Sequence, residues 1–274
     1  MGNKLENVRG FDLELMKSTR EQLHQAVQLV SAVPRSYLPH DPSDELASLS
    51  WHEEREALES KQVAGFVFSL SLKEMYVSIL NNDQEFEALA LEGKSVNQGL
   101  RWLKEHVNKF GLAEEQLHLK LPYEIGIDNF DTSLKFHTET QQELSNLYAG
   151  AKAILDQVVK ENMEASAIRC WPHHFDIATL IPLQENENGE VTSSLGVGFS
   201  PGDQVISQPY FYVNIWPDSL LSDLNKHDLW AGHWNDTEWS GAVLHYQDLL
   251  KASDVTKTVQ HFISTTISRF RNSR

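Results

Sequence analysis

The spacing of hydrophobic positions alternates between a helical and a two-residue period along the chain. Residues 11–33 carry apolar side chains on one stripe, which predicts a helix that Pro34 ends. Residues 43–60 predict a short acidic helix. Strict alternation follows, with turns too short for a parallel crossover, and predicts an antiparallel meander of strands at residues 66–72, 76–80 and 86–91.

The middle of the chain returns to the helical period. Ser95 and Gln98 fit a capping box, and Gly111 suits the end of the helix that an apolar stripe predicts between them. Residues 117–125 then predict a strand, and residues 140–161 predict a second long amphipathic helix.

The last part of the chain predicts a second meander. Its strands are expected at residues 166–183, 193–199 and 209–216, with a polar hairpin tip over residues 184–192. Residues 218–248 predict irregular structure that is rich in Trp and His. A closing helix is expected from about residue 253.

These elements favour an α+β fold: a mostly antiparallel sheet from two three-stranded meanders, packed by helices, with helices at both ends of the chain. We expect an N-terminal helical segment over residues 1–60 and a single α+β domain over residues 61–274. The alternative division places two lobes at residues 61–135 and 163–274.

The charge balance argues against a nucleic-acid partner, because 39 acidic residues against 23 Lys and Arg give a formal net charge of −16. No apolar run approaches the length of about 20 residues that spans a bilayer, and the N-terminus lacks a signal-peptide apolar region. The single cysteine, Cys170, excludes an intramolecular disulfide and favours a core role. We therefore expect a soluble, acidic, cytoplasmic protein without a membrane partner. Its oligomeric state stays open.

The densest mixture of aromatic and ionisable side chains lies within residues 169–212. On a strand, His173 and His174 would point to opposite faces, and only His174 would share a face with Asp176. Such a His-x-Asp pair is a candidate metal half-site or an oriented general base. The structural alternative is that Asp176 is a buried carboxylate with a hydrogen-bonding partner.

A divalent metal is a candidate cofactor, with His174 and Asp176 as its ligands. Zinc needs three or four ligands, so others would have to come from Glu124, His137, His233 or His245, and the spacing selects none of them. The candidate catalytic residues are His174, Asp176 and Glu124.

The candidate ligand-binding residues are Trp171, His173, Asp203, Tyr210 and Tyr212. The two tyrosines share a strand face, where they line a pocket or belong to the core with their hydroxyls at its rim. Asp203 follows a Ser-Pro-Gly turn, and either binds a ligand or accepts hydrogen bonds from its own backbone.

Several catalytic signatures are absent from the sequence, among them the nucleophile elbow, the P-loop, the dinucleotide fingerprint and the H-E-x-x-H motif. Two classes of function stay open. The first is a small-molecule site on the second meander, with metal-assisted hydrolysis as one form of it. The second is a non-catalytic ligand-binding or assembly protein, so the sequence does not decide whether the protein is an enzyme.

Three motifs resemble an uncharacterised bacterial family with a domain of unknown function. They are F-D-I-A at residues 175–178, G-F-S-P-G at 198–202, and Y-F-Y at 210–212, against F-D-L-A, G-F-W-P-G and F-Y-x-Y in that family. Trp171 lies one residue further from Phe175 than the family's tryptophan, so His173 and His174 do not carry over. The resemblance implies a shared framework and no reaction.

Overall fold

The computed structural model describes residues 4–7, 10–41, 43–126, 129–221, 228–236 and 239–272. Antiparallel sheets and helices make up the fold, which confirms the predicted α+β class. The chain divides into two compact units. Unit 1 contains residues 1–10, 146–168 and 176–274, and unit 2 contains residues 11–145 and 169–175. The predicted division into domains stays a prediction.

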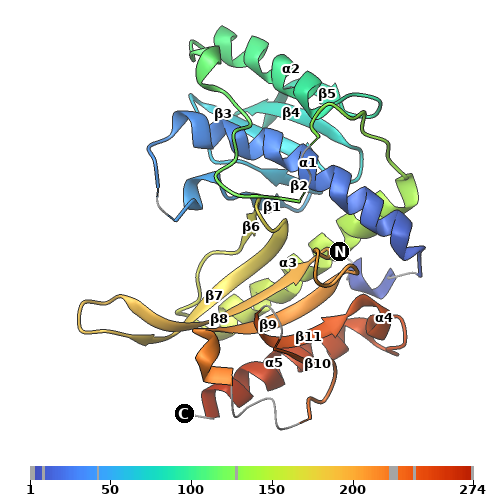
Figure 1. Ribbon diagram of the computed structural model, residues 1–274, viewed down its shortest axis with the longest axis vertical. Coiled ribbons are helices and arrows are strands. Elements are labelled where there is room, and N and C mark those ends of the chain that lie inside the picture. The colour runs from blue at the N-terminus through green and yellow to red at the C-terminus, as the bar shows by residue number, and fades with distance from the viewer. Residues whose placement is uncertain are drawn as a thin grey trace. The chain divides into compact units, whose positions relative to one another are not determined.

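Unit 2 contains a sheet with its strands in sequence order, as Figure 1 shows: β1 (Ser50–His52), β2 (Ala57–Glu59), β3 (Phe66–Ser71), β4 (Tyr76–Asn81) and β5 (Gln84–Ala90). All neighbours pair antiparallel, so the predicted first meander is confirmed. The helix predicted over residues 43–60 is wrong, because β1 and β2 pair there and bury Trp51 and Leu58. Tertiary pairing outweighs the weak helical pattern of this stretch.

Unit 2 also contains two long helices, α1 (Leu13–Tyr37) and α2 (Val96–Lys109). The Ser95 and Gln98 side chains form the predicted capping box of α2. The predicted stop of α1 at Pro34 is wrong, since Pro34 lies inside the helix and its carbonyl accepts the N–H of Leu38. Because Pro34 lies near the end of the helix, its lack of a backbone N–H removes only one hydrogen bond of the last turn.

Unit 1 contains a second antiparallel sheet, with its strands adjacent in the order β10 (His233–Asp236), β11 (Ser240–His245), β9 (Tyr210–Trp216), β8 (Val191–Ser200) and β7 (Asp176–Glu185). The hairpin of β7 and β8 matches the predicted tip. Residues 218–248 are less irregular than predicted, because β10 and β11 lie within them.

Helices cover one face of this sheet. Tyr148 of α3 (Thr138–Glu161) meets Phe199 of β8 edge-on at 5.5 Å between ring centroids. Phe270 of α5 (Val255–Asn272) meets Trp234 of β10 at 5.8 Å. The inward residues of β8 and β9, such as Val197 and Val213, are fully buried on this side. The opposite face therefore carries the alternate residues, including Tyr210 and Tyr212.

The remaining short elements are η1 (Lys4–Asn7), η2 (Glu45–Ala47), η3 (Glu114–Gln116), β6 (Arg169–Trp171), η4 (Asp218–Leu221) and α4 (Tyr246–Leu249). The strand predicted at residues 117–125 is wrong; that stretch is a connection. Within the described ranges, no helix is long and apolar enough to cross a bilayer.

Candidate functional site

A tyrosine–aspartate pair crosses the face of the unit 1 sheet that lies opposite the helices. The Tyr212 hydroxyl, on β9, donates a 2.5 Å hydrogen bond to Oδ2 of Asp176, the first residue of β7. Strand β8 runs between these two strands, so the phenol ring spans one whole strand to reach the carboxylate. Asp176 is only 7% exposed, whereas Tyr212 is half-buried.

Glycine at position 198 makes this arrangement possible. Gly198 is paired with Tyr212, and a Cβ atom placed on it would lie 2.6 Å from Cζ and from the hydroxyl oxygen of that ring. The same Cβ would lie 2.8 Å from the backbone oxygen of Ile177. Distances this short are excluded by van der Waals repulsion, so only glycine leaves room for the ring next to β8.

A second tyrosine–aspartate pair lies beside the first. The Tyr210 hydroxyl donates a 2.5 Å hydrogen bond to Oδ2 of Asp203, while Oδ1 of Asp203 accepts the backbone N–H groups of Val205 and Ile206. Burial and the neighbouring Asp203 carboxylate raise the pKa of the Tyr210 phenol. Tyr210 therefore stays protonated at neutral pH and keeps its role as the donor.

Trp239 completes an aromatic group with the two tyrosines. Its ring centroid lies 6.3 Å from that of Tyr210 and 6.0 Å from that of Tyr212, and the tyrosine centroids are 6.0 Å apart. A Cβ on Gly241 would lie 2.8 Å from Cζ3 of Trp239, so glycine again makes room for an aromatic ring. We call these five side chains, Asp176, Asp203, Tyr210, Tyr212 and Trp239, the tyrosine–aspartate face.

A separate aromatic cluster in unit 2 surrounds His173. Its ring centroid lies 5.3 Å from Tyr123, 6.0 Å from Trp171 and 4.3 Å from His174. The Tyr123 hydroxyl accepts a hydrogen bond from Arg35 Nη2 at 2.8 Å and donates one to Gln28 Oε1 at 3.0 Å. Burial raises the pKa of Tyr123 to about 12. These contacts fix the aromatic cluster to helix α1.

Helix α1 also forms hydrogen bonds to the turn that carries His173 and His174. The carbonyl of Pro172 accepts hydrogen bonds from Nε2 of His24 and Nε2 of Gln28, both at 2.8 Å. The His24 ring stacks on Phe175 with centroids 5.4 Å apart. Burial lowers the pKa of His24 to about 4 and that of His173 to about 4 as well, so both rings are neutral at pH 7.

A family model for a family of unknown function, DUF5996, matches residues 10–271. The chain belongs to this family. No curated protein and no solved structure was found to match it. The family assignment confirms the resemblance found in the sequence. Asp176, Gly198 and Tyr212 come from the three motifs of that resemblance, and in this DUF5996 chain they meet in one hydrogen-bonded arrangement.

The predicted placement of the histidines on a strand is wrong. His173 and His174 lie in a turn over residues 172–175, which Pro172 and the left-handed Phe175 (φ 55°) set between β6 and β7. His174 therefore does not share a strand face with Asp176. The two residues belong to different units, and a common catalytic or metal site for them stays a prediction.

The other predicted site residues divide between the units. Asp176, Asp203, Tyr210 and Tyr212 lie together in unit 1, while Trp171 and His173 lie in the aromatic cluster of unit 2. Glu124 is exposed on the connection after η3 and also belongs to unit 2. In the described part of the chain, no three His, Cys, Asp or Glu side chains form a group that could hold a metal ion.

Sequence reasoning missed Trp239, His24, Gln28 and Tyr123 as site neighbours. His24 and Gln28 are four residues apart on α1 and so share a helix face, which was a detectable signal. Trp239 gave none, because it lies in the stretch predicted to be irregular. His233 and His245, considered as further ligands, have ring centroids 4.4 Å apart on β10 and β11. Burial lowers the pKa of His245.

Proposed function

We propose that this protein binds a small organic cation, a primary or secondary amine, on the tyrosine–aspartate face of unit 1. The observation that carries the proposal is the direction of the two phenol hydrogen bonds. Each hydroxyl proton is directed to an aspartate, so each tyrosine oxygen can enter a further hydrogen bond only as an acceptor. A ligand that meets this face must therefore donate hydrogen bonds.

Aromatic rings and charge favour a positive ligand among the donors. The faces of aromatic rings are negative and attract an ammonium group by about 0.5–2 kcal/mol. Tyr212 and Trp239 are half-buried, so both offer ring surface, and Asp203 offers a half-buried carboxylate. The net charge of −16 also raises the local concentration of cations around the protein.

The side chains of the tyrosine–aspartate face differ in burial, and this difference decides which of them can contact a ligand. Tyr212, Trp239 and Asp203 are partly accessible and would contact the amine directly. Asp176 and Tyr210 are only 7% and 5% exposed. Their hydrogen bonds would position Tyr212 and Asp203 for contact with the amine. Asp176 also supports a positive ligand at the Tyr212 oxygen, because its carboxylate makes that oxygen a better acceptor.

Catalysis by His174, Asp176 and Glu124, with a divalent metal as cofactor, is the further proposal that the sequence makes. Elemental analysis of protein purified without chelator tests it, since stoichiometric metal and a melting temperature lowered by EDTA would support a metal site. The cytoplasm is the proposed compartment, on the grounds of the single cysteine and the acidic composition.

Calorimetric titration with matched pairs of ligands tests the binding proposal. Each pair consists of a primary amine and the alcohol in which a hydroxyl replaces the ammonium group. We expect saturable binding of amines, at least about tenfold tighter than of the alcohols, which corresponds to about 1.4 kcal/mol. Equal affinity within the pairs, or no binding of any amine, contradicts the proposal.

A further inference from the structure

We infer that unit 1 holds a second ligand site, a hollow between α3 and α5 that takes a planar heteroaromatic molecule without a phosphate. The hollow has a volume of about 700 Å³. That volume lies within the range of roughly 300–1,000 Å³ found for small-molecule sites. It is separate from the tyrosine–aspartate face, with which it shares no residue.

The floor of the hollow is aliphatic. Ile154 and Val158 of α3 and Ile263 and Ile267 of α5 line it, and each is at most 6% exposed. These side chains belong to the core between the two helices. They present an apolar surface that favours a ligand with a flat hydrophobic face.

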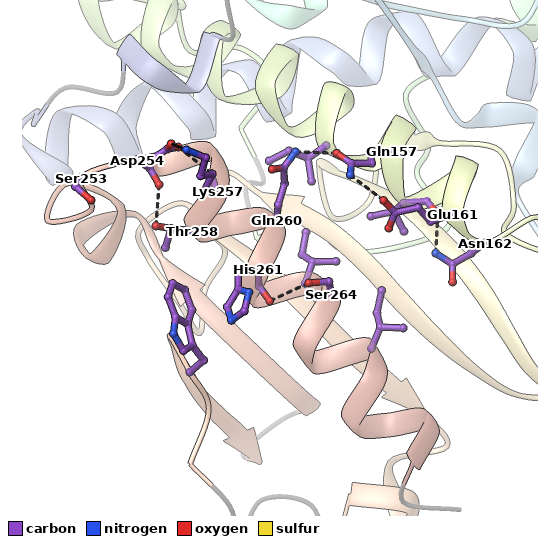
Figure 2. Close-up of a pocket in the computed structure, with 15 residues that line it drawn as sticks. Gln157, Glu161, Asn162, Ser253, Asp254, Lys257, Thr258, Gln260, His261 and Ser264 are labelled. Carbon is purple, nitrogen blue, oxygen red and sulfur yellow. Dashed lines mark hydrogen bonds and ion pairs between the residues drawn. The ribbon is translucent and has the colours of Figure 1, made fainter.

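A row of hydrogen-bonded polar side chains at the hollow runs from α5 to α3, as Figure 2 shows. Gln260 Nε2 donates to Gln157 Oε1 at 2.7 Å, and Gln157 Nε2 donates to Glu161 Oε1 at 2.8 Å. These two bonds fix the orientation of both amides. Each amide keeps one further N–H, and Gln260 Oε1 and the second oxygen of Glu161 are acceptors. The row therefore offers both donors and acceptors, and those of the Gln260 amide lie side by side.

An adjacent donor and acceptor of this kind complement the edge of a nucleobase. A carboxamide pairs with adenine through one donor and one acceptor at once, as Asn and Gln do in DNA recognition. A simple hydrocarbon ring offers no such edge. The row therefore selects a heteroaromatic ring over an apolar ring of the same shape.

An exposed tryptophan lies at the same hollow and supports a planar ligand. Trp230 is 62% exposed, and its ring meets His261 edge-on with centroids 4.2 Å apart. The indole therefore keeps most of its surface for a ligand. Nucleobases stack favourably on aromatic side chains, whatever their sequence identity.

The charges around the hollow argue against a phosphate on the ligand. Lys257, a cation at its rim, pairs with Asp254 at 2.9 Å. Glu161 adds a carboxylate inside the polar row. Among the described residues that line the hollow, Lys257 is the one Lys or Arg and it is paired with Asp254, so a free base or nucleoside fits better than a nucleotide.

Titration of the full-length protein with adenine, followed by tryptophan fluorescence and calorimetry, tests the inference. We expect saturable quenching by adenine and affinity about tenfold weaker for both benzimidazole, which lacks the amidine edge, and adenosine monophosphate. Absence of saturable adenine binding overturns the inference. So does benzimidazole or the monophosphate binding as tightly as adenine.

Two variants locate the binding. Trp230→Ala and Gln157→Leu change exposed residues, so both should fold, and each should weaken adenine binding about tenfold. Trp216→Ala, which removes another exposed tryptophan of unit 1, and Gln184→Leu on β7 are the matched controls and should bind adenine as the wild type does. Unchanged affinity in Trp230→Ala and Gln157→Leu, or an equal loss in the controls, overturns the assignment of the site.

Discussion

The Tyr212 hydroxyl reaches across strand β8 to donate a 2.5 Å hydrogen bond to Asp176. This bond joins the first and third strands of a three-stranded meander, and it directs the phenol proton to a carboxylate. Tyr212→Phe should lower the free energy of unfolding by about 1.5–3 kcal/mol, because it removes a hydrogen bond to a charged group. Chemical denaturation measures the change.

A double-mutant cycle with Asp176→Asn separates the pair from other effects of each substitution. The coupling energy between the two positions should be about 1 kcal/mol or more. Tyr76→Phe, on strand β4 of unit 2, is the control and should show no coupling to Asp176→Asn. Additive effects of Tyr212→Phe and Asp176→Asn would mean that the hydrogen bond contributes nothing to stability.

Gly198→Ala should disrupt the tyrosine–aspartate face directly. The added methyl group would collide with the Tyr212 ring and with the backbone oxygen of Ile177, at a cost of about 1–3 kcal/mol or more. Amine binding should be lost together with this stability. Gly10→Ala is the matched control, because its methyl group would meet only Leu250 Cδ1 at an ordinary 3.7 Å. Equal melting temperatures for the two variants would contradict the close packing of ring and glycine.

Unit 2 should lose stability as the pH falls from about 6.5 to about 4. In the folded chain burial keeps His24 neutral down to a pKa of about 4, whereas the ordinary histidine pKa is 6.5. Within this window the unfolded chain binds more protons, so the free energy of unfolding decreases with decreasing pH. His24 accounts for a loss of up to about 3 kcal/mol. His173, which is partly exposed, adds less.

Denaturation curves at several pH values measure this dependence. His24→Gln removes the titrating ring and should flatten the curve between pH 6.5 and pH 4. His118→Gln, at an exposed position of unit 2, should leave the slope unchanged. The explanation fails if the slope of His24→Gln equals that of the wild type.

Cys170 should react with a thiol reagent only when unit 2 opens. The side chain is fully buried on β6, and its backbone pairs with Leu49. We expect complete modification in denaturant and slow modification under native conditions, at a rate set by unfolding. Rapid native modification, comparable to that of free cysteine, would contradict the packing around β6.

Local patterns in the sequence predicted most of the helices and strands. The capping box of Ser95 and the alternation from Phe66 onward are local signals, and both elements form where expected. The errors have non-local causes. Strands β1 and β2 depend on pairing with β3, and the connection at residues 117–125 depends on the contacts of Tyr123 with α1. Neither interaction is visible within a short window of sequence.

The candidate site was predictable only where its residues follow from a local pattern. The two-residue period placed Tyr210 and Tyr212 on one face, and the structure places Asp176 and Asp203 within hydrogen-bonding distance of them. The turn at Pro172 was not predicted, so His174 was wrongly placed on the face of Asp176. Trp239 reaches the site through the pairing of β11 with β9, which sequence spacing does not reveal.

The indole N–H signals of the seven tryptophans test the binding of an amine at the tyrosine–aspartate face most directly. A ¹H–¹⁵N spectrum recorded during titration with a primary amine resolves the indole signals individually. The Trp239→Phe variant identifies the signal of Trp239. We predict a saturable shift of Trp239, the matched alcohol having little effect, while Trp230 at the hollow does not move. An unmoved Trp239 in the presence of saturating amine would contradict the proposed function.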